Sequence, residues 1–314
     1  MNNSQHNNQE EKIDLKIFID RYLIFWKQII FSVIIFLLIG FIYNRYSTKI
    51  YKSSTTLLIK EESNASLGSD DVFEGLDLFG GQKNIKNEIG ILESFSLTKK
   101  TLERLNFRTS YYHSGNLKSD DIYKKTPFKV VIDEINPQTI NQKFYIKLVS
   151  EDEFILSTDF NNFKLFDLST ETYISNKEFD FDYENTHKFD EKITTDFFSF
   201  KISKNDLTLF KEENWTNYYF IVSSYNDLTK NYLKNLEVLE IEKDASILKI
   251  SLEGSNPIKI NDFLNKFTEL YLAAGLDEKN QITSNTIQFI NEQLASISDS
   301  LSDVESSLEN FKEN

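Results

Sequence analysis

The chain has 314 residues, 40% of them apolar and 27% charged, which is the composition of a globular protein with room for about two domains. It contains no cysteine, so disulfide scaffolds, thiolate metal sites and cysteine nucleophiles are excluded. Its 35 basic and 49 acidic side chains give a formal net charge of −14 at pH 7, which argues against nucleic acid as a partner because phosphate contacts need a basic face.

An apolar stretch near the N-terminus, residues 24–43, predicts a transmembrane helix. It holds one charged residue, Lys27, and at about 1.5 Å per residue it spans ~30 Å, the thickness of a bilayer's hydrocarbon core. The alternatives are a signal peptide or a buried core helix, but a mixed-charge tail, residues 1–23, precedes the stretch and bulky side chains follow it. Basic residues are balanced on the two sides, so the positive-inside rule leaves the orientation open.

The segment after the predicted span changes from strand to loop to helix. Alternation of polar and apolar residues from Tyr51 to Ile59 predicts a strand. Residues 61–84 are rich in glycine and carboxylates and predict a loop, whose acidic residues lack the spacing of a calcium-binding helix-loop-helix site. Helical spacing across residues 85–107 predicts two short helices, with Ser94 at the start of the second.

Residues 108–224 have an apolar period of two. Short strands separated by polar turns predict a β-rich domain of the sandwich or barrel type. The predicted strands cover residues 127–133, 143–149, 153–157, 163–168, 197–202 and 217–222.

Helical spacing returns after this domain. A helix is predicted from Tyr225 to Asn235, followed by strands at residues 238–242 and 247–252. Asn256 and Pro257 then mark the start of another helix, because asparagine caps a helix well and proline fits its first turn. This helix is predicted to run through Leu276.

The last segment, residues 277–314, carries a continuous apolar seam. Its members recur in steps of three and four, which predicts a coiled coil or helical hairpin; the alternative is an amphipathic helix on a globular core. The chain reaches Asn314 without a partner for this seam, so we expect a truncated protein, a fragment or one part of a split gene. The seam consists of Ile287, Ile290, Leu294, Ile297, Leu301, Val304, Leu308 and Phe311.

The predicted fold class is therefore a membrane-anchored α+β protein. It has one N-terminal transmembrane helix, an α/β module with an inserted β-rich domain, and a long C-terminal coiled-coil helix. The predicted divisions are a tail at 1–23, a transmembrane helix at 24–43, the α/β module at 44–107 and 225–276, the inserted domain at 108–224, and the arm at 277–314.

The order of these elements resembles the polysaccharide co-polymerases, which comprise Wzz-type chain-length determinants and the related bacterial tyrosine autokinases of capsule and exopolysaccharide export. The resemblance is carried by the apolar span with its following strand (13–59), the helix pair (87–107), the two strands with the proline-started helix (237–272), and the seam (285–312). Residues 108–224 resemble an insertion seen in Bacteroidota-like members.

This resemblance implies an inner-membrane protein with a cytoplasmic N-terminus, a periplasmic body and a ring-like homo-oligomer. The implied partners are a polysaccharide polymerase, an outer-membrane export channel, the polysaccharide itself and the lipid bilayer. Kinase-type members also carry a phosphate-binding loop and a tyrosine-rich tail, whereas this sequence contains no GxxxxGK[ST] motif and its 15 tyrosines are dispersed. The chain is therefore expected to be non-catalytic and to need no cofactor.

Other chemistry finds little support in the sequence. The histidines, His6, His113 and His187, lie in different segments, so no metal site is predicted. Acidic pairs such as Asp120 and Asp121 are expected to be solvated. Trp215, Tyr218 and Tyr219 have rings that stack well on sugars, but aromatic residues on alternating strands more often belong to a core.

The leading hypothesis is a scaffold that regulates the chain length or export of a capsular, exopolysaccharide or O-antigen polymer. A periplasmic adaptor subunit of an efflux or secretion system is the alternative, because it too combines one anchor, β modules and a coiled coil. A sensor ectodomain would need a second span and a signalling helix, and neither is seen in the sequence.

Overall fold

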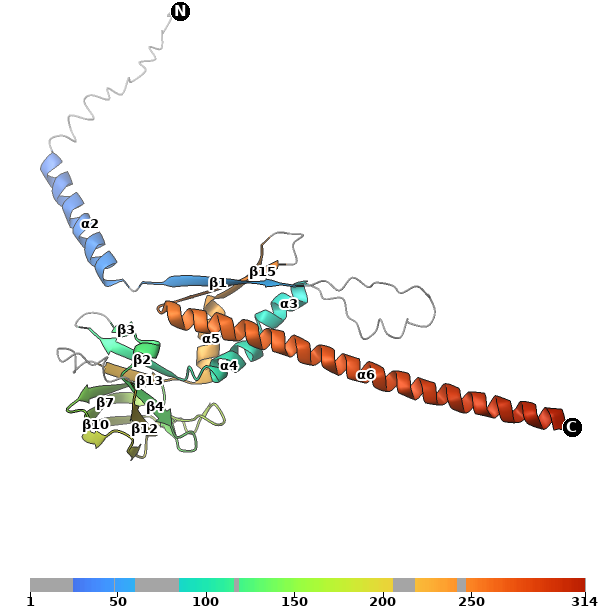
Figure 1. Cartoon of the computed structure of the whole chain (residues 1–314). Coiled ribbons are helices and arrows are strands. Elements are labelled where there is room, and N and C mark those ends of the chain that lie inside the picture. The colour runs from blue at the N-terminus through green and yellow to red at the C-terminus, as the bar shows by residue number, and fades with distance from the viewer. Residues whose placement is uncertain are drawn as a thin grey trace, which may run out of the picture. The chain divides into compact units, whose positions relative to one another are not determined.

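A computed structural model describes residues 25–47, 49–59, 85–115, 119–205, 218–241 and 247–313. The predicted tail at 1–23, the predicted loop at 61–84, His6 and Trp215 lie outside the described residues. The chain divides into two units, Met1–Lys49 and Ile50–Asn314 (Figure 1).

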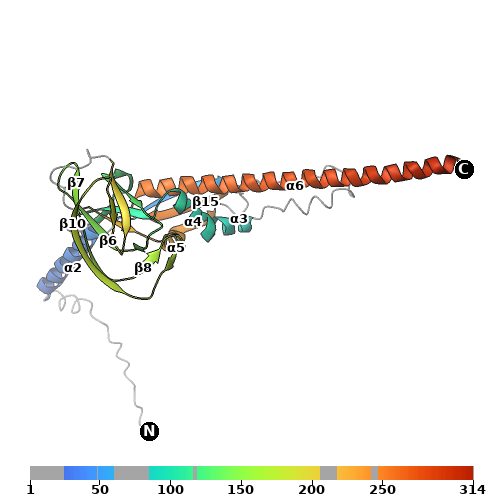
Figure 2. The ribbon, with the colours of Figure 1, turned by 90° about the horizontal axis from the view of Figure 1, so that it is seen from below.

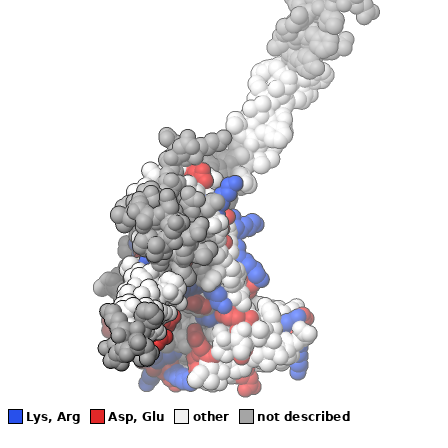
Figure 3. Space-filling view, turned by 90° about the vertical axis from the view of Figure 1, so that its right-hand side faces the viewer, with Lys and Arg blue, Asp and Glu red and all other residues white. Residues whose placement is uncertain are grey.

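The described part of the first unit is one apolar helix, α2 (Trp26–Tyr46). The stretch from Trp26 to Arg45 has a mean hydropathy of 2.0, and none of it is buried. Figure 3 draws α2 as an almost uncoloured cylinder, because charged side chains are confined to its ends. The predicted N-terminal apolar helix is thus confirmed, and at about 1.5 Å per residue it is long enough to cross a bilayer.

The second unit contains a three-stranded antiparallel sheet in the order β1-β15-β14. Helices cover one face of this sheet, where alternate strand residues such as Leu248 and Ile250 are fully buried. Phe263 and Phe267 contribute the helical side of this core. The strands are β1 (Tyr51–Leu58), β14 (Leu236–Glu240) and β15 (Ile247–Gly254), and the helices are α3 (Ile85–Leu92), α4 (Phe95–Arg104), α5 (Tyr225–Asn235) and the start of α6 (Pro257–Glu313).

Local signals in the sequence account for several of these boundaries. The Ser94 hydroxyl accepts a hydrogen bond from the Leu97 backbone N–H at 3.3 Å, so the predicted cap between the two short helices is confirmed. The Ser224 hydroxyl caps α5 in the same way, at 3.0 Å from the Asp227 nitrogen. At both of these starts a serine oxygen satisfies one of the first free N–H groups of the helix.

Between α4 and α5 the chain forms a separate set of sheets. A six-stranded antiparallel sheet has the order β10-β7-β6-β13-β2-β3, and two three-stranded sheets have the orders β11-β12-β4 and β5-β8-β9. We call this part the β module. Figure 2 shows β6, β7 and β10 curving around one side of it. Its elements are β2 (Thr109–Ser114), β3 (Ser119–Asp121), a 3-10 turn (Tyr123–Lys125), β4 (Phe128–Ile132), β5 (Gln138–Thr139), β6 (Lys143–Leu148), β7 (Glu153–Phe163), β8 (Leu165–Asp167), β9 (Thr172–Tyr173), β10 (Phe179–Lys188), β11 (Lys192–Thr194), β12 (Ser199–Lys204) and β13 (Tyr218–Val222).

Phenylalanine fills the interior of the β module. Phe144 and Phe220 stack with ring centroids 4.8 Å apart, and Phe198 and Phe200 meet Phe144 edge-on at 5.2 Å. All four side chains are at most 1% exposed. Aromatic pairs of this kind add about 0.5–1.5 kcal/mol each beyond the area that they bury. The β module therefore has a core of its own, distinct from the core beneath α6.

The structure corrects several sequence predictions, among them one strand and one helix. Strand β10 was not predicted, because charged and polar side chains interrupt the apolar alternation after Tyr183, yet β10 pairs with β7 along most of its length. The helix that starts at Pro257 does not end at Leu276 but continues for 57 residues to Glu313. Gly275 does not end it, since a lone glycine weakens a helix without adopting the left-handed conformation of a cap.

Candidate functional site

The most prominent candidate surface lies on α6. Its first turns pack on the sheet through Ile260, Phe263, Phe267 and Tyr271, all at most 8% exposed. Among the described side chains from Leu272 to Leu308, none is buried. At about 1.5 Å per residue, this part of α6 extends ~55 Å past its last buried residue (Figure 1).

The predicted seam lies entirely on this extension. The exposed fractions of its described side chains range from 43% for Ile290 to 64% for Val304. Steps of three and four place all of them in one stripe along the helix. Burying an aliphatic side chain is worth about 1.5–3 kcal/mol, so covering seven half-exposed ones would contribute on the order of 10 kcal/mol. The described members are Ile287, Ile290, Leu294, Ile297, Leu301, Val304 and Leu308; the side chain of Phe311 lies outside the described residues.

The start of α6 is tied to the β module. The side-chain oxygen of Asn256 accepts hydrogen bonds from the N–H groups of Ile258 and Lys259, at 3.0 and 3.1 Å, and Pro257 occupies the first helical position. The Asn256 side-chain nitrogen donates to the carbonyl oxygen of Asp121 at 2.8 Å. One side chain therefore caps α6 and holds it to the end of β3.

An ion pair stands beside this cap. Lys259 Nζ lies 3.3 Å from Asp121 Oδ2 and 3.1 Å from the Ser110 hydroxyl, and its side chain is only 13% exposed. The same ammonium group lies over the ring of Phe107, 5.3 Å from its centroid. These contacts join α6 to β2 and β3 and pair the two charged groups, Lys259 and Asp121, with each other.

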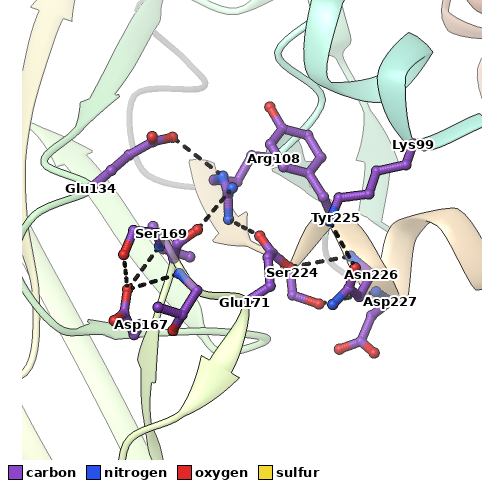
Figure 4. Close-up of polar contacts among 12 residues, drawn as sticks. Lys99, Arg108, Glu134, Asp167, Ser169, Glu171, Ser224, Tyr225, Asn226 and Asp227 are labelled. Atoms are coloured by element: carbon purple, nitrogen blue, oxygen red, sulfur yellow. Dashed lines mark hydrogen bonds and ion pairs between the residues drawn. The ribbon is translucent and has the colours of Figure 1, made fainter. Parts of the chain in front are cut away.

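A second junction joins the β module to α5 (Figure 4). Arg108 Nη1 lies 2.8 Å from Glu171 Oε1, and the guanidinium carbon lies 4.1 Å from the centroid of the Tyr225 ring. Glu171 Oε2 also accepts a hydrogen bond from the Asn226 N–H at 3.2 Å. A carboxylate at a helix N-terminus is favoured by the helix dipole, so Glu171 stabilises both Arg108 and the start of α5.

The contacts at these two junctions were not predicted from the sequence. Arg108 follows a helix and Glu171 lies in a polar turn, so neither has a distinguishing local pattern. The backbone of Glu171 is left-handed, with φ of 54°. A polar residue in a turn can adopt this conformation, but nothing in the sequence indicates it. Asp121 and Lys259 are separated by more than a hundred residues and meet only through the fold.

The histidines and aromatic residues singled out in the sequence have structural partners. His187 Nε2 lies 2.7 Å from the Tyr183 hydroxyl oxygen, and burial lowers the pKa of His187. His113 meets the ring of Tyr218 edge-on at 5.3 Å. Tyr218 and Tyr219 are 6% and 5% exposed, so their faces are not open to a sugar. In the described part of the chain, no group of three or more histidine or acidic side chains is arranged to hold a metal ion.

Residues 11–105 match the family Wzz, chain length determinant protein. A putative tyrosine-protein kinase in the cps region of Klebsiella pneumoniae is 24% identical over 293 residues, which is 88% of this chain and 35% of the relative. The tyrosine-protein kinase ptk of Acinetobacter johnsonii is 21% identical over 321 residues, covering 99% of this chain and 42% of the relative. The putative tyrosine-protein kinase AmsA of Erwinia amylovora is 30% identical over 95 residues, covering 30% of this chain and 13% of the relative.

These matches confirm the resemblance drawn from the sequence. The Wzz region covers the apolar helix α2, strand β1 and helices α3 and α4. The chain spans about two fifths or less of the length of these curated relatives.

Proposed function

We propose that this chain, whose residues 11–105 form a Wzz-type chain-length-determinant region, regulates the length or export of a capsular, exopolysaccharide or O-antigen polymer. The match to that region is the observation that carries the proposal. Two features agree with it: an apolar helix long enough to span a bilayer, and a folded body that carries a long exposed helix.

In this proposal α2 anchors the chain in the inner membrane, with the N-terminus in the cytoplasm and the body in the periplasm. All described side chains of α2 are exposed to the surroundings, and lipid is a solvent in which such a surface is stable. The orientation follows the family, since the charges that flank the helix do not distinguish the two sides.

The seam on α6 would bring subunits together. A stripe of aliphatic side chains that is half exposed in one chain becomes stable when it meets a second helix as a coiled coil. We propose that such contacts build a ring-like homo-oligomer beside the polymerase and below the outer-membrane export channel. The two junctions support a scaffold role, because they hold the β module firmly on α5 and α6.

Catalysis is assigned to no residue of this chain. The curated relatives are named tyrosine-protein kinases, but the sequence has no GxxxxGK[ST] motif with which to hold the phosphates of a nucleotide. The proposed role is therefore that of a non-catalytic co-polymerase part. A periplasmic adaptor of an efflux or secretion system would share the anchor, the β module and the long helix, but the Wzz match favours the co-polymerase.

The test is deletion of the gene in its own host, followed by complementation. We expect the length distribution of the surface polysaccharide, separated by gel electrophoresis, to shift in the deletion strain and to return with the wild-type gene. An unchanged amount and length distribution in the deletion strain would refute the proposal. A loss of drug efflux or protein secretion with normal polysaccharide would support the adaptor instead.

A further inference from the structure

A polar pocket of about 210 Å³ opens where the β module meets α5 and the start of α6. Strands β2 and β3 supply one wall through Ser110, Tyr112 and Asp121. Helix α5 supplies another through Asn231 and Tyr232, and the junction of α6 closes the base through Lys259. Amide and hydroxyl groups predominate among the lining side chains.

The two buried ionic groups of the pocket balance each other. Lys259 and Asp121, its two buried ionic groups, neutralise each other across 3.3 Å, and their side chains are 13% and 7% exposed. Glu253, at the rim, is about half exposed and shares Lys52 with Glu237, at 3.3 and 2.8 Å. A charged ligand in the interior of the pocket would have to break the buried Asp121–Lys259 pair, and separating a buried pair is costly. The pocket therefore favours an uncharged ligand.

Two hydrogen-bonding groups on residues that line this pocket make no hydrogen bond to any residue that the structure describes. The Tyr232 hydroxyl makes no hydrogen bond to any residue that the structure describes. Its ring is held between Phe263 and Phe107, with centroids at 4.7 and 6.1 Å, so the direction of the hydroxyl is set. Burial raises the pKa of Tyr232, which keeps this group protonated and able to donate.

Asn231 provides the second group. Its side-chain oxygen accepts a hydrogen bond from Asn235 at 3.4 Å, which leaves the side-chain nitrogen as a donor toward the pocket. Within the described residues this nitrogen donates to no acceptor. A ligand that carries several hydroxyl groups offers oxygens to both donors, because each hydroxyl both donates and accepts.

We propose that this pocket binds one uncharged, hydroxyl-rich ring, that of a neutral sugar residue. The proposal rests on the polysaccharide-related function proposed above and names a site for the polymer on this chain. The pocket adjoins the Asn256 cap, so an occupied pocket would contact both the β module and the first turn of α6.

The experiment uses the whole chain in detergent micelles and a panel of neutral methyl glycosides of common hexoses. Saturation-transfer NMR and titration identify which glycosides bind. Tyr232→Phe removes only a hydroxyl, and Asn231→Ala removes an exposed amide, so both variants are expected to fold. Each should weaken binding by about three- to tenfold, as the loss of one hydrogen bond does. Tyr145→Phe, at an exposed position of β6 outside the pocket, should leave binding unchanged.

Equal weakening by all three variants, or no saturation transfer from any glycoside, overturns the proposal. Stronger binding of methyl glucuronoside or inorganic phosphate than of the neutral glycosides also overturns it. Binding is also compared between the free glycosides and oligosaccharides released from the host's own polymer. This comparison shows whether the ligand is a residue of the polymer or a free sugar. If the purified chain binds glycosides but deletion of its gene leaves the polymer length unchanged, the binding site is supported and the proposed function is rejected.

Discussion

The seam on α6 predicts a specific loss of assembly. In the triple variant Leu294→Ala, Ile297→Ala and Leu301→Ala, the three removed side chains are 60%, 62% and 57% exposed in the single chain. Full burial of such a side chain is worth about 1.5–3 kcal/mol, so covering the exposed part contributes ~1–2 kcal/mol at each position. The triple variant should therefore weaken association by ~3–5 kcal/mol per subunit, which is a factor of more than about 100.

The folding of the single chain should change little. Exposed side chains contribute little to the free energy of unfolding, and alanine favours a helix at least as well as leucine. A matched triple variant, Glu292→Ala, Asp299→Ala and Ser306→Ala, replaces three exposed polar residues outside the seam, on the same helix.

The assay is the mass distribution of the detergent-solubilised protein, measured by sedimentation and by mass photometry over a range of concentrations. We expect wild-type protein and the polar control to form the same oligomer, and the seam variant to dissociate. Identical masses for the seam variant and wild type at every concentration would refute the assignment of the seam as an assembly surface. Circular dichroism checks that α6 stays helical in both triple variants.

Three further predictions concern the junctions and the response to pH. Arg108→Ala leaves the Glu171 carboxylate buried without its cation and should lower the free energy of unfolding by about 3–5 kcal/mol in urea titrations. Lys201→Ala, which breaks only an exposed pair with Asp190, should cost less than about 1 kcal/mol; equal losses would contradict the role given to Arg108. Asn256→Ala removes the cap of α6 and should cost about 1–2 kcal/mol in thermal unfolding, and no change would show that the cap is unimportant. Burial raises the pKa of Tyr111 to about 12, above its value near 10 in the unfolded chain, so the stability that it contributes is complete below pH 10 and is lost as the pH rises toward 12. Alkaline titration followed by tyrosinate absorbance should show this tyrosine ionising after the exposed tyrosines or together with unfolding, and ionisation near pH 10 in the folded protein would contradict its burial.

Local patterns were enough to predict many elements, and their success has a physical cause. The apolar run of α2, the caps at Ser94 and Asn256 and the alternation in β6 are properties of neighbouring residues, so a short window contains all the information needed. Strand β10 could not be predicted in this way, because polar and charged side chains replace the alternation of Phe179, Phe181 and Tyr183 over its second half. It lies at the edge of the six-stranded sheet, where such side chains can face water.

The contacts that join the modules could not be predicted, since they depend on residues that are distant in the chain. Arg108 meets Glu171 and Tyr225 only because a β hairpin and a helix converge there. The Tyr232 hydroxyl, which has no hydrogen-bond partner among the described residues, likewise owes its position to packing, because nothing in the spacing of α5 marks it as different from a core tyrosine. The seam could be recognised as a pattern in the sequence, whereas only the fold shows that its side chains are exposed.

The unbroken course of α6 gives it the mechanics of a lever arm. The helix has its fulcrum at the sheet, where Tyr271 is the last buried residue, and runs ~55 Å farther to Leu308. A rotation of about 5° at the fulcrum displaces Leu308 by about 5 Å, which is close to one helical turn. Asn256 and Lys259 connect the short end of this lever, ~20 Å from the fulcrum, to the β module, so a shift of about 2 Å in that module would be magnified at the far end to about 5 Å, which is comparable to the spacing between seam residues.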